Sequence, residues 1–284
     1  MAAEQSSSKV CVNCGKPVEA EYCSHCGEKI LSEKDRSVSS LLTDHLELFL
    51  NFDSKLFRTV VLLVTKPGYL TTEYWTGRRI AYVKPLQLLI GINLFYFFAS
   101  FVSEHLGYYV RVMFPSLNDI LTDRIFSPWA AQVVKEKLAA THGGVTVYVR
   151  SFNAHLEDAA KSLVVILVPI LALFLQLFFF RPKRNFLYHL TAAIHLVCFY
   201  VLFWSSFMIV LGLLTKLSLV ATIGWLKYIS IAVLLMYIFM ALRRIYERSV
   251  IVTFLTSAVF VFAVIQAITN IYDLILFCFV YWIV

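Results

Sequence analysis

Five long apolar runs decide which folds are open to this chain. A helix needs about 20 predominantly apolar residues to cross the hydrocarbon core of a bilayer. Of the 284 residues, 60% are apolar and 15% charged, whereas soluble domains carry about 45–50% and about 25%. The sequence therefore predicts an all-α, polytopic membrane protein with about five transmembrane helices. They are expected at about residues 86–103, 162–180, 186–214, 217–242 and 250–284.

The charges of the connecting segments predict the orientation of the spans. Residues 181–184 read RPKR and residues 243–248 read RRIYER, whereas residues 104–161 carry six basic and six acidic side chains. Lys and Arg gather in the short loops on the cytoplasmic side of a membrane. We therefore expect the N-terminus and both basic loops in the cytoplasm, the 104–161 loop outside and the C-terminus outside.

A basic and aromatic segment precedes the first span. Residues 66–85, KPGYLTTEYWTGRRIAYVKP, are called the collar here. Aromatic rings settle at the level of the lipid headgroups, and each basic residue near an anionic surface contributes about 1 kcal/mol of attraction. The collar predicts anionic lipid contacts at Arg78, Arg79 and Lys84. Topology alone is the alternative explanation of these charges.

Two amphipathic helices are expected ahead of the collar. Apolar positions recur at helical spacing between Val38 and Phe52, and a second helix is expected at residues 54–65, with Asp53 as its N-cap and Pro67-Gly68 at its end. The second helix is too short to span. It is expected to lie on the inner membrane surface or to pack on the spans of its own chain.

Four cysteines near the N-terminus have the spacing of a zinc site. Cys11 and Cys14, and then Cys23 and Cys26, form two Cys-x-x-Cys-Gly knuckles. Four thiolates with no open position are typical of structural rather than catalytic Zn²⁺. Residues 1–10 lack the apolar core of a signal peptide, so we expect the thiols in the reducing cytoplasm.

The net charge of +7 does not indicate nucleic-acid binding. The surplus is dispersed along the flanks of the apolar runs, and the cysteine segment lacks the basic footprint that phosphate backbones require. A protein partner of the zinc ribbon, or a purely structural role, is expected instead. Cys198 and Cys278 stand alone in apolar runs and are expected to be buried.

The sequence also predicts the secondary structure of the outer loop and of the last apolar run. Ser127-Pro128 predicts the start of a helix that extends to Ala140, and the alternation of residues 145–150 predicts a half-exposed strand. Residues 250–284 would form a helix of about 52 Å, longer than the hydrocarbon core of about 30 Å. We expect this run to protrude or to break near Thr269-Asn270.

The polar residues inside the spans either line a polar path or binding cavity through the bundle or make interhelical hydrogen bonds. Gln176 and His195 are expected at similar depth, so that a hydrogen bond can join them. Lys227 and Asp273 are expected near the outer interface as an ion pair. Asn93 and Gln266 are placed near mid-membrane, and His189 is placed at the inner interface.

Common catalytic motifs are absent from the sequence. It holds no nucleotide-binding, zinc-protease or hydrolase signature, which weakens an enzyme interpretation without closing it. His155, Glu157 and Asp158 stand close together ahead of a span. They are expected to be a solvated helix start, with metal binding or acid–base chemistry as the alternative.

Several of these features together resemble an uncharacterised family of bacterial inner-membrane proteins with a zinc-ribbon head. The resemblance rests on the CxxCG…YCxxCG segment, on Asn51-Phe52-Asp53, on the collar and on a later helix with His189 and His195. It implies the fold and the bacterial inner membrane, and it brings no established activity. Tyr188 stands where the family often has an acidic residue, which puts an acid–histidine pair in doubt.

These observations divide the chain into a zinc ribbon (1–30), interfacial helices with the collar (31–84) and a transmembrane bundle (85–284). The leading hypothesis is a non-enzymatic transporter, channel or lipid-interacting component with a cytoplasmic docking head, with candidate ligand-binding residues Arg78, Arg79, Lys84, Gln176, His189 and His195. A scaffold that acts through the ribbon and an integral-membrane enzyme on a lipid-linked substrate are the alternatives. The sequence leaves the oligomeric state open.

Overall fold

The computed structural model describes residues 9–11, 15–18, 24–25, 55–78, 81–106, 116–140, 144–179, 185–217 and 223–284. The chain divides into two compact units, Met1–Lys55 and Leu56–Val284. The domain boundaries expected at residues 30 and 84 stay predictions. The expected helix between Val38 and Phe52 and the basic loop at 181–184 lie outside the described residues.

The described part of the first unit is a short hairpin. Strands β1 (Lys9–Val10) and β2 (Pro17–Val18) pair antiparallel. In the turn between them, the Gly15 N–H donates to the Cys11 carbonyl over 2.8 Å, and Gly15 has a φ of +71°. Glycine adopts this left-handed conformation without a steric penalty. Cys14, Cys23 and Cys26 lie outside the described residues.

The described residues of the second unit are helical. A helix over residues 56–65 comes first. It is followed by α2 (Tyr69–Trp75), α3 (Pro85–His105), α4 (Leu117–Asp123), α5 (Ser127–Ala140), α6 (Val145–Leu163), the 3₁₀ turn η2 (Val164–Ile166), α7 (Leu167–Phe178), α8 (Phe186–Lys216), α9 (Ile223–Tyr246), α10 (Val250–Ala267), the π-helical turn η4 (Ile268–Tyr272) and α11 (Asp273–Ile283).

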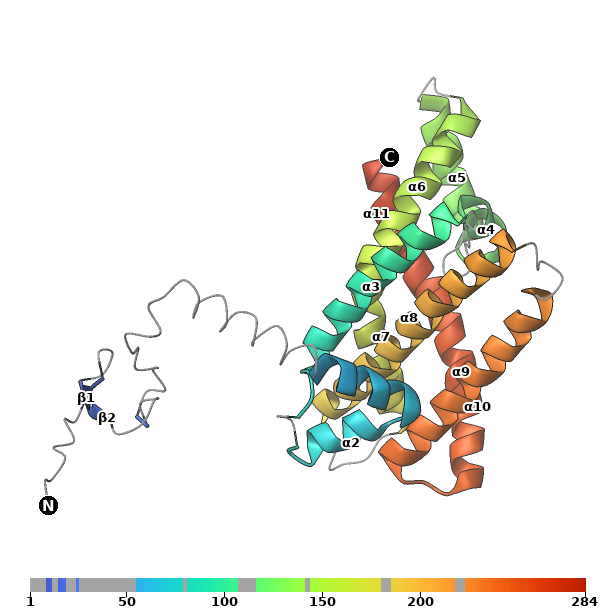
Figure 1. The fold of residues 1–284 in the computed structure, drawn as a ribbon. Coiled ribbons are helices and arrows are strands. Elements are labelled where there is room, and N and C mark those ends of the chain that lie inside the picture. The colour runs from blue at the N-terminus through green and yellow to red at the C-terminus, as the bar shows by residue number, and fades with distance from the viewer. Residues whose placement is uncertain are drawn as a thin grey trace, which may run out of the picture. The chain divides into compact units, whose positions relative to one another are not determined.

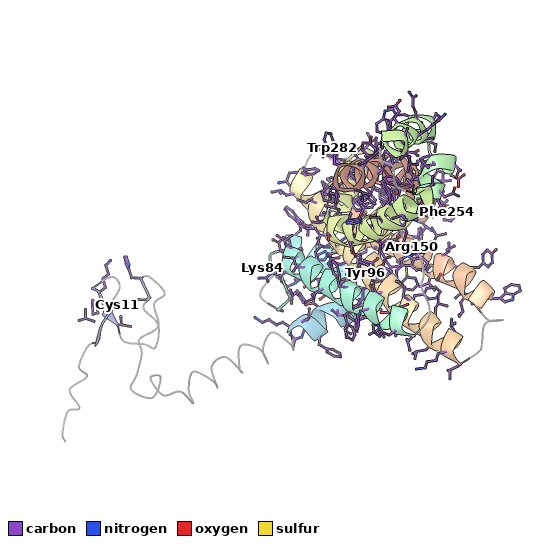
Figure 2. All side chains as sticks on the ribbon, turned by 90° about the horizontal axis from the view of Figure 1, so that it is seen from above. Cys11, Lys84, Tyr96, Arg150, Phe254 and Trp282 are labelled. Carbon is purple, nitrogen blue, oxygen red and sulfur yellow. The ribbon has the colours of Figure 1, made fainter. Side chains whose placement is uncertain are left out.

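Five segments of this unit are long and apolar enough to cross a membrane, as predicted. They are Pro85–Ser103, Val145–Phe178, Phe186–Lys216, Tyr228–Tyr246 and Val250–Ile283. Large apolar side chains such as Phe254 and Trp282 are exposed on the surface (Figure 2), where a bilayer would cover them. These segments indicate a multi-pass membrane protein.

Helix α8 is the centre of the bundle. In α8, 56% of an apolar stretch of 18 residues is buried, against 33% or less of the corresponding stretch in each of the other four. It packs most extensively against α3 and α7. The residues 56–65 and α2 lie at one end of the bundle, and α4 and α5 lie at the opposite end (Figure 1). These are called the collar end and the cap end, and α4 with α5 is called the cap.

The strand predicted at residues 145–150 is wrong, because these residues open helix α6. Val145 and Val147 are exposed, so their alternation reflects no buried sheet face. The buried residues of α6 are Phe152, Leu156, Ala159 and Ala160, a spacing that forms one stripe on a helix. The helical spacing of the buried residues from Phe152 onward therefore agrees with the observed conformation, whereas the alternation of residues 145–150 does not. The predicted helix up to Ala140 is confirmed as α5.

The last apolar run neither ends nor breaks at Thr269-Asn270. The helix continues from α10 through η4 into α11. A π turn inserts one residue into a helix and rotates the part that follows. Beyond it, Leu276, Phe277 and Val280 are buried, and the Phe277 ring lies 5.7 Å from that of Phe152 in α6. Packing against α6 therefore explains the apolar character of α11.

Candidate functional site

The collar turns sharply at Pro67 and Gly68 and lies directly on α9. Proline lacks the N–H that would continue the preceding helix. Gly68 has a φ of +75°, and a β-carbon there would lie 2.7 Å from the Ala241 carbonyl oxygen and 3.1 Å from Ile245 Cγ1. Glycine is therefore required both by the backbone conformation and by the close approach to α9.

Polar groups of α9 anchor the segment that leads into the collar. The Tyr237 hydroxyl donates to the Leu63 carbonyl over 2.6 Å, and Arg244 Nη1 donates to the Pro67 carbonyl over 2.8 Å. The last carbonyls of a helix have no partner within the helix. Side chains from α9 satisfy them and hold the collar against the spans. Of the two placements expected for residues 54–65, packing on its own spans is observed at Leu63, which is buried.

His195 binds the collar rather than Gln176. The Thr71 hydroxyl and His195 Nδ1 share a hydrogen bond of 2.9 Å, and both residues are buried. The sequence predicted that His195 bonds to Gln176. Its Nδ1 bonds to Thr71 instead, because α2 covers this part of α8. Beside the bond is a pocket of about 10 Å³ with Lys66 in its lining, which is about the space of one water molecule.

His189 belongs to the junction of α8 and α9. Its Nδ1 lies 2.8 Å from the Tyr246 hydroxyl, and the two rings stack with centroids 5.6 Å apart. The neighbouring Tyr188 hydroxyl donates to the Ile245 carbonyl over 2.9 Å. Trp75 from α2 packs against the Tyr188 ring at 5.2 Å. The Tyr246 hydroxyl is thus the partner of His189 Nδ1, whereas Tyr188, at the position where the resembling family often has an acid, bonds to a backbone carbonyl.

Arg78 is paired with an acid of the collar. Its Nε donates to Glu73 Oε2 over 2.6 Å, and its Nη2 also contacts Glu73 Oε1. Glu73 is buried, whereas 67% of the Arg78 side chain is exposed. The hydrogen bond from Arg78 holds the pKa of Glu73 below its ordinary value. Arg78 is therefore a fixed, partly neutralised cation rather than an isolated one.

Tyr69 and Tyr82 close the collar on itself. Their hydroxyls lie 3.3 Å apart and their rings meet edge to face. The hydrogen bond with Tyr82 is the main cause that raises the pKa of Tyr69 to about 12. Val83 adds a second closure, since its N–H donates to the Thr59 hydroxyl over 3.1 Å. These two contacts close the collar into a loop, while its basic side chains Lys66, Arg78 and Lys84 remain exposed.

Exposed cations surround the collar end. The acidic residues described there are Glu73 and Glu247, and Glu73 is occupied by Arg78. Arg79 lies outside the described residues. Lys84, whose side chain has no ion-pair partner among the described residues, is visible at the edge of the bundle in Figure 2. The exposed Lys and Arg side chains of this end are Arg58, Lys66, Arg78, Lys84, Arg243 and Arg244.

The polar residues predicted inside the spans do not form one connected path. Among the described residues, no hydrogen bond joins Asn93, Gln176, His195 or Gln266 to another of the four. Asn93 Oδ1 is buried without a described partner. Gln266 Oε1 accepts a hydrogen bond of 3.4 Å from Asn270 Nδ2, one turn later in the same run of helix. The structure thus brings His195 to the collar and leaves the other three apart.

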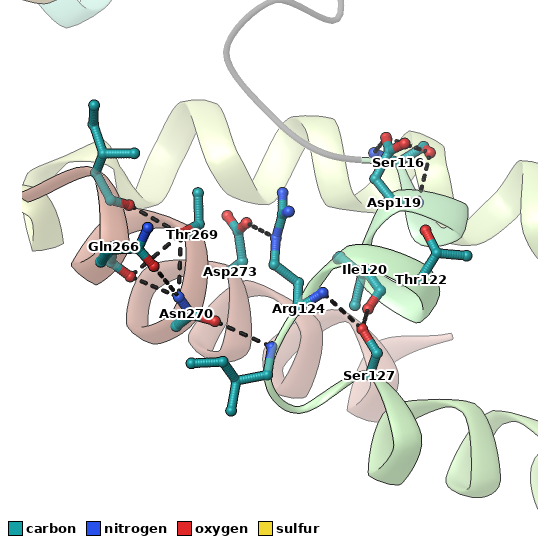
Figure 3. Close-up of polar contacts among 12 residues, drawn as sticks. Ser116, Asp119, Ile120, Thr122, Arg124, Ser127, Gln266, Thr269, Asn270 and Asp273 are labelled. Atoms are coloured by element: carbon teal, nitrogen blue, oxygen red, sulfur yellow. Dashed lines mark hydrogen bonds and ion pairs between the residues drawn. The ribbon is translucent and has the colours of Figure 1, made fainter. Parts of the chain in front are cut away.

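Asp273 pairs with Arg124 of the cap. Arg124 Nε donates to Asp273 Oδ2 over 2.7 Å, and the Ile125 N–H donates to Asn270 Oδ1 over 3.2 Å (Figure 3). Lys227, the partner predicted for Asp273, has a side chain outside the described part. The turn between α4 and α5 brings Arg124 over η4, so Arg124 is the described partner of Asp273, and the pair with Lys227 stays a prediction. These two contacts tie the cap to the π turn.

His155, Glu157 and Asp158 do not converge. The exposed His155 bonds through Nδ1 to the Ser151 carbonyl of its own helix, and Glu157 pairs with Lys161 at 2.6 Å. Within the described ranges, no three His, Cys, Asp or Glu side chains are grouped as metal ligands would be.

An apolar cleft of about 320 Å³ lies between α7, α8, α9 and α10. The sequence did not predict this cleft, because its lining residues come from four separate helices. Representative lining residues from the four helices are Leu171, Trp204, Leu234 and Val261.

The comparison with protein families points to the collar. Residues 53–97 match a family model described as a protein of unknown function (DUF3667). The match covers the helix at 56–65, the collar and the first half of α3. It fits the expected resemblance to an uncharacterised membrane-protein family. No curated protein and no solved structure matches the chain significantly.

Proposed function

We propose that this chain is a non-enzymatic protein of the bacterial inner membrane that binds anionic lipid headgroups at its collar. The observation that carries this proposal is the fixed collar with exposed cations around it. Hydrogen bonds from α8 and α9 to Thr71 and Pro67 of the collar, and to Leu63 in the helix before it, hold the collar in place. The cations therefore stand at set positions at the ends of the spans before any lipid arrives.

The difference in charge between the two ends of the bundle supports the proposed orientation of the chain in the membrane. The exposed collar end carries mostly Lys and Arg, whereas the cap mixes Asp119, Asp123 and Glu136 with basic residues. An excess of cations marks the cytoplasmic side. The collar, with the N-terminus, is accordingly placed in the cytoplasm, and the cap and the C-terminus are placed outside.

Lipid binding is favoured over transport by the interior of the bundle. A transport path needs polar groups that follow one another across the membrane. His195 instead bonds to Thr71 of the collar, and the Gln266 side-chain oxygen accepts from Asn270 of its own helix. The cleft between α7 and α10 is lined by apolar side chains. These features suit a protein that holds lipid rather than one that passes ions.

The N-terminal segment is proposed to hold structural Zn²⁺ and to dock a cytoplasmic protein. Cys11, Cys14, Cys23 and Cys26 would be its ligands, and the metal would stabilise the local fold. The turn in which Cys11 accepts from Gly15 supports the first knuckle, because such a turn folds the backbone back beside the first thiol.

Reconstitution tests the lipid proposal. The chain is placed in nanodiscs of mixed neutral and anionic phospholipid, and the lipids that remain bound on release are counted by native mass spectrometry. The variant Lys84→Gln with Arg243→Gln removes two exposed cations of the collar end. At about 1 kcal/mol per charge, anionic preference should fall up to about thirty-fold.

A matched control removes the same charge at the other end. Lys135→Gln with Arg150→Gln alters two exposed cations of α5 and α6 and should leave the preference unchanged. An equal loss in the control, or no preference for anionic lipid in the parent chain, would refute the proposal.

A further inference from the structure

The turn at Pro67 and Gly68 brings two cations from distant parts of the chain to one place. Lys66 precedes the turn, and Arg244 Nη1 donates to the Pro67 carbonyl over 2.8 Å, across 177 residues of sequence. The close approach of Gly68 to Ala241, one helical turn before Arg244, fixes this arrangement. Lys66 and Arg244 are called the turn cations here.

Both turn cations are exposed and keep their charge available. Lys66 Nζ lies over the Tyr69 ring, 5.4 Å from its centroid. Among the described residues, the Arg244 side chain bonds only to a backbone carbonyl, which carries no net charge. A guanidinium has five N–H donors, so most of those of Arg244 remain open to a ligand.

No described acid balances the turn cations. Of the acidic residues described at the collar end, Glu73 is held by Arg78. Glu247 forms no ion pair with either turn cation in the part of the chain that the structure describes. Like charges repel one another, so an anion bound at the turn would stabilise both cations.

The turn cations lie at the depth expected for lipid phosphates. Arg244 stands in the last turn of α9, at the end of the membrane-capable segment Tyr228–Tyr246. Tyr69, below Lys66 Nζ, meets Tyr82 edge to face, and aromatic rings settle at the headgroup level. The pocket beneath the turn, of about 10 Å³, has room for about one water molecule. A headgroup therefore binds at the surface of the turn and not beneath it.

We propose that the turn cations bind the phosphate monoester headgroup of a lipid in preference to a phosphodiester. This inference rests on the lipid binding proposed above for the collar and names the headgroup that the collar selects. A phosphate monoester carries about −1.5 to −2 charges at pH 7, whereas a diester carries a single charge. Arginine matches phosphate with two parallel hydrogen bonds, and lysine adds a point charge. A monoester therefore balances both cations, and a diester leaves one of them unbalanced.

Competition between two lipids in nanodiscs of the full chain tests this inference. The nanodiscs hold equal amounts of dioleoyl phosphatidate, a monoester, and dioleoyl phosphatidylglycerol, a diester, in phosphatidylcholine. Native mass spectrometry counts the lipids that remain bound on release. The parent chain should retain phosphatidate about fivefold over phosphatidylglycerol at about pH 7.5, as expected for one further charge pair. At about pH 5 this preference should vanish, because the monoester then holds its second proton, whose pKa is about 6.

Three variants separate the turn from the general charge of the collar end. Lys66→Gln and Arg244→Gln should each lower the retention of phosphatidate to about that of phosphatidylglycerol. Lys84→Gln is the matched control, since it removes an exposed cation of the same end that does not flank the turn. It should weaken both lipids alike and leave their ratio unchanged. Limited proteolysis shows whether the collar stays in place, and Lys66→Gln decides the matter if Arg244→Gln releases it.

The outcomes distinguish this inference from the function on which it rests. Equal retention of the two anionic lipids at about pH 7.5, or a full preference for phosphatidate in Lys66→Gln, would overturn the inference alone. Loss of all preference over phosphatidylcholine in the parent chain would refute the proposed function as well. Displacement of phosphatidate by excess inorganic phosphate would identify free phosphate as the ligand and overturn the assignment to a lipid.

Discussion

Thr71 in the collar and His195 in α8 share a buried hydrogen bond of 2.9 Å across 124 residues of sequence. The bond joins the segment that matches the family model to the central helix of the bundle. It assigns to His195 a role in holding the collar.

Thr71→Val should destabilise the collar. The change keeps the shape of the side chain but leaves His195 Nδ1 without its partner, which costs about 1–3 kcal/mol for a buried group. Thermal unfolding in detergent and proteolysis of the collar measure the effect. Thr65→Val is the control, since the exposed Thr65 bonds only to the Val61 carbonyl of its own helix. Equal effects of the two changes would contradict the role of Thr71.

Gly68→Ala should destabilise more than Gly77→Ala. Both glycines have a positive φ, +75° and +93°, so both variants carry a backbone penalty of about 1–2 kcal/mol. A β-carbon at Gly77 meets nothing within 4 Å, whereas one at Gly68 meets the Ala241 carbonyl oxygen. Overpacking should add about 1–3 kcal/mol at Gly68. Unfolding midpoints of the two variants give the difference directly, and the same midpoint for both would exclude the close approach.

Asp273→Asn should release the cap from the π turn. Asp273 is 2% exposed and Arg124 pairs with it, and loss of one partner of a buried pair costs about 3–5 kcal/mol. Hydrogen exchange should rise across α4 and α5 while α3 and α8 remain protected. Asp123→Asn, on the same cap with its side chain exposed, is the control. Unchanged exchange in the cap of Asp273→Asn would show that the pair does not hold it.

The stability of the collar should fall in acid. The pKa of Glu73 is lowered by Arg78, so the folded state binds this proton less readily than the unfolded state. The contribution of the pair is complete above the unfolded pKa of about 4.3 and is lost as the pH falls through the lower folded value. Limited proteolysis of the collar from about pH 6 to about pH 3, a range that spans the unfolded pKa of a glutamate, measures the change. In Glu73→Gln this particular pH dependence should disappear, and an identical profile in both proteins would exclude Glu73 as its source.

Removal of metal should affect the N-terminal segment and leave the bundle intact. The full chain is expected to bind about one Zn²⁺ for the four cysteines, and chelation or Cys14→Ser should release it. Because the chain divides at Lys55, the unfolding midpoint of the spans should not change. Metal analysis and thermal unfolding report the two results separately. Cys198→Ser serves as the control, since Cys198 is buried in α8. Full zinc content in Cys14→Ser would contradict the proposed ligand set.

The number of apolar segments, their order and the position of the collar could all be predicted from local sequence. Apolar runs and clusters of Lys and Arg are local properties, and each of them is readable without knowledge of its neighbours. The end of the first described helix at Pro67-Gly68 is local as well, because it depends on the backbone of these two residues. The helix predicted from Pro128 to Ala140 is confirmed, because its start likewise depends on the local residues Ser127 and Pro128.

Which polar groups meet depends on how the helices pack in three dimensions. His195 bonds to Thr71 and Asp273 pairs with Arg124, 149 residues away, and the sequence suggested nearer partners of similar depth. The same holds for the helical start of α6 and for the cleft around Trp204, since both depend on which faces of separate helices pack together. Hydropathy orders the spans across a membrane, but it does not specify how they rotate against one another.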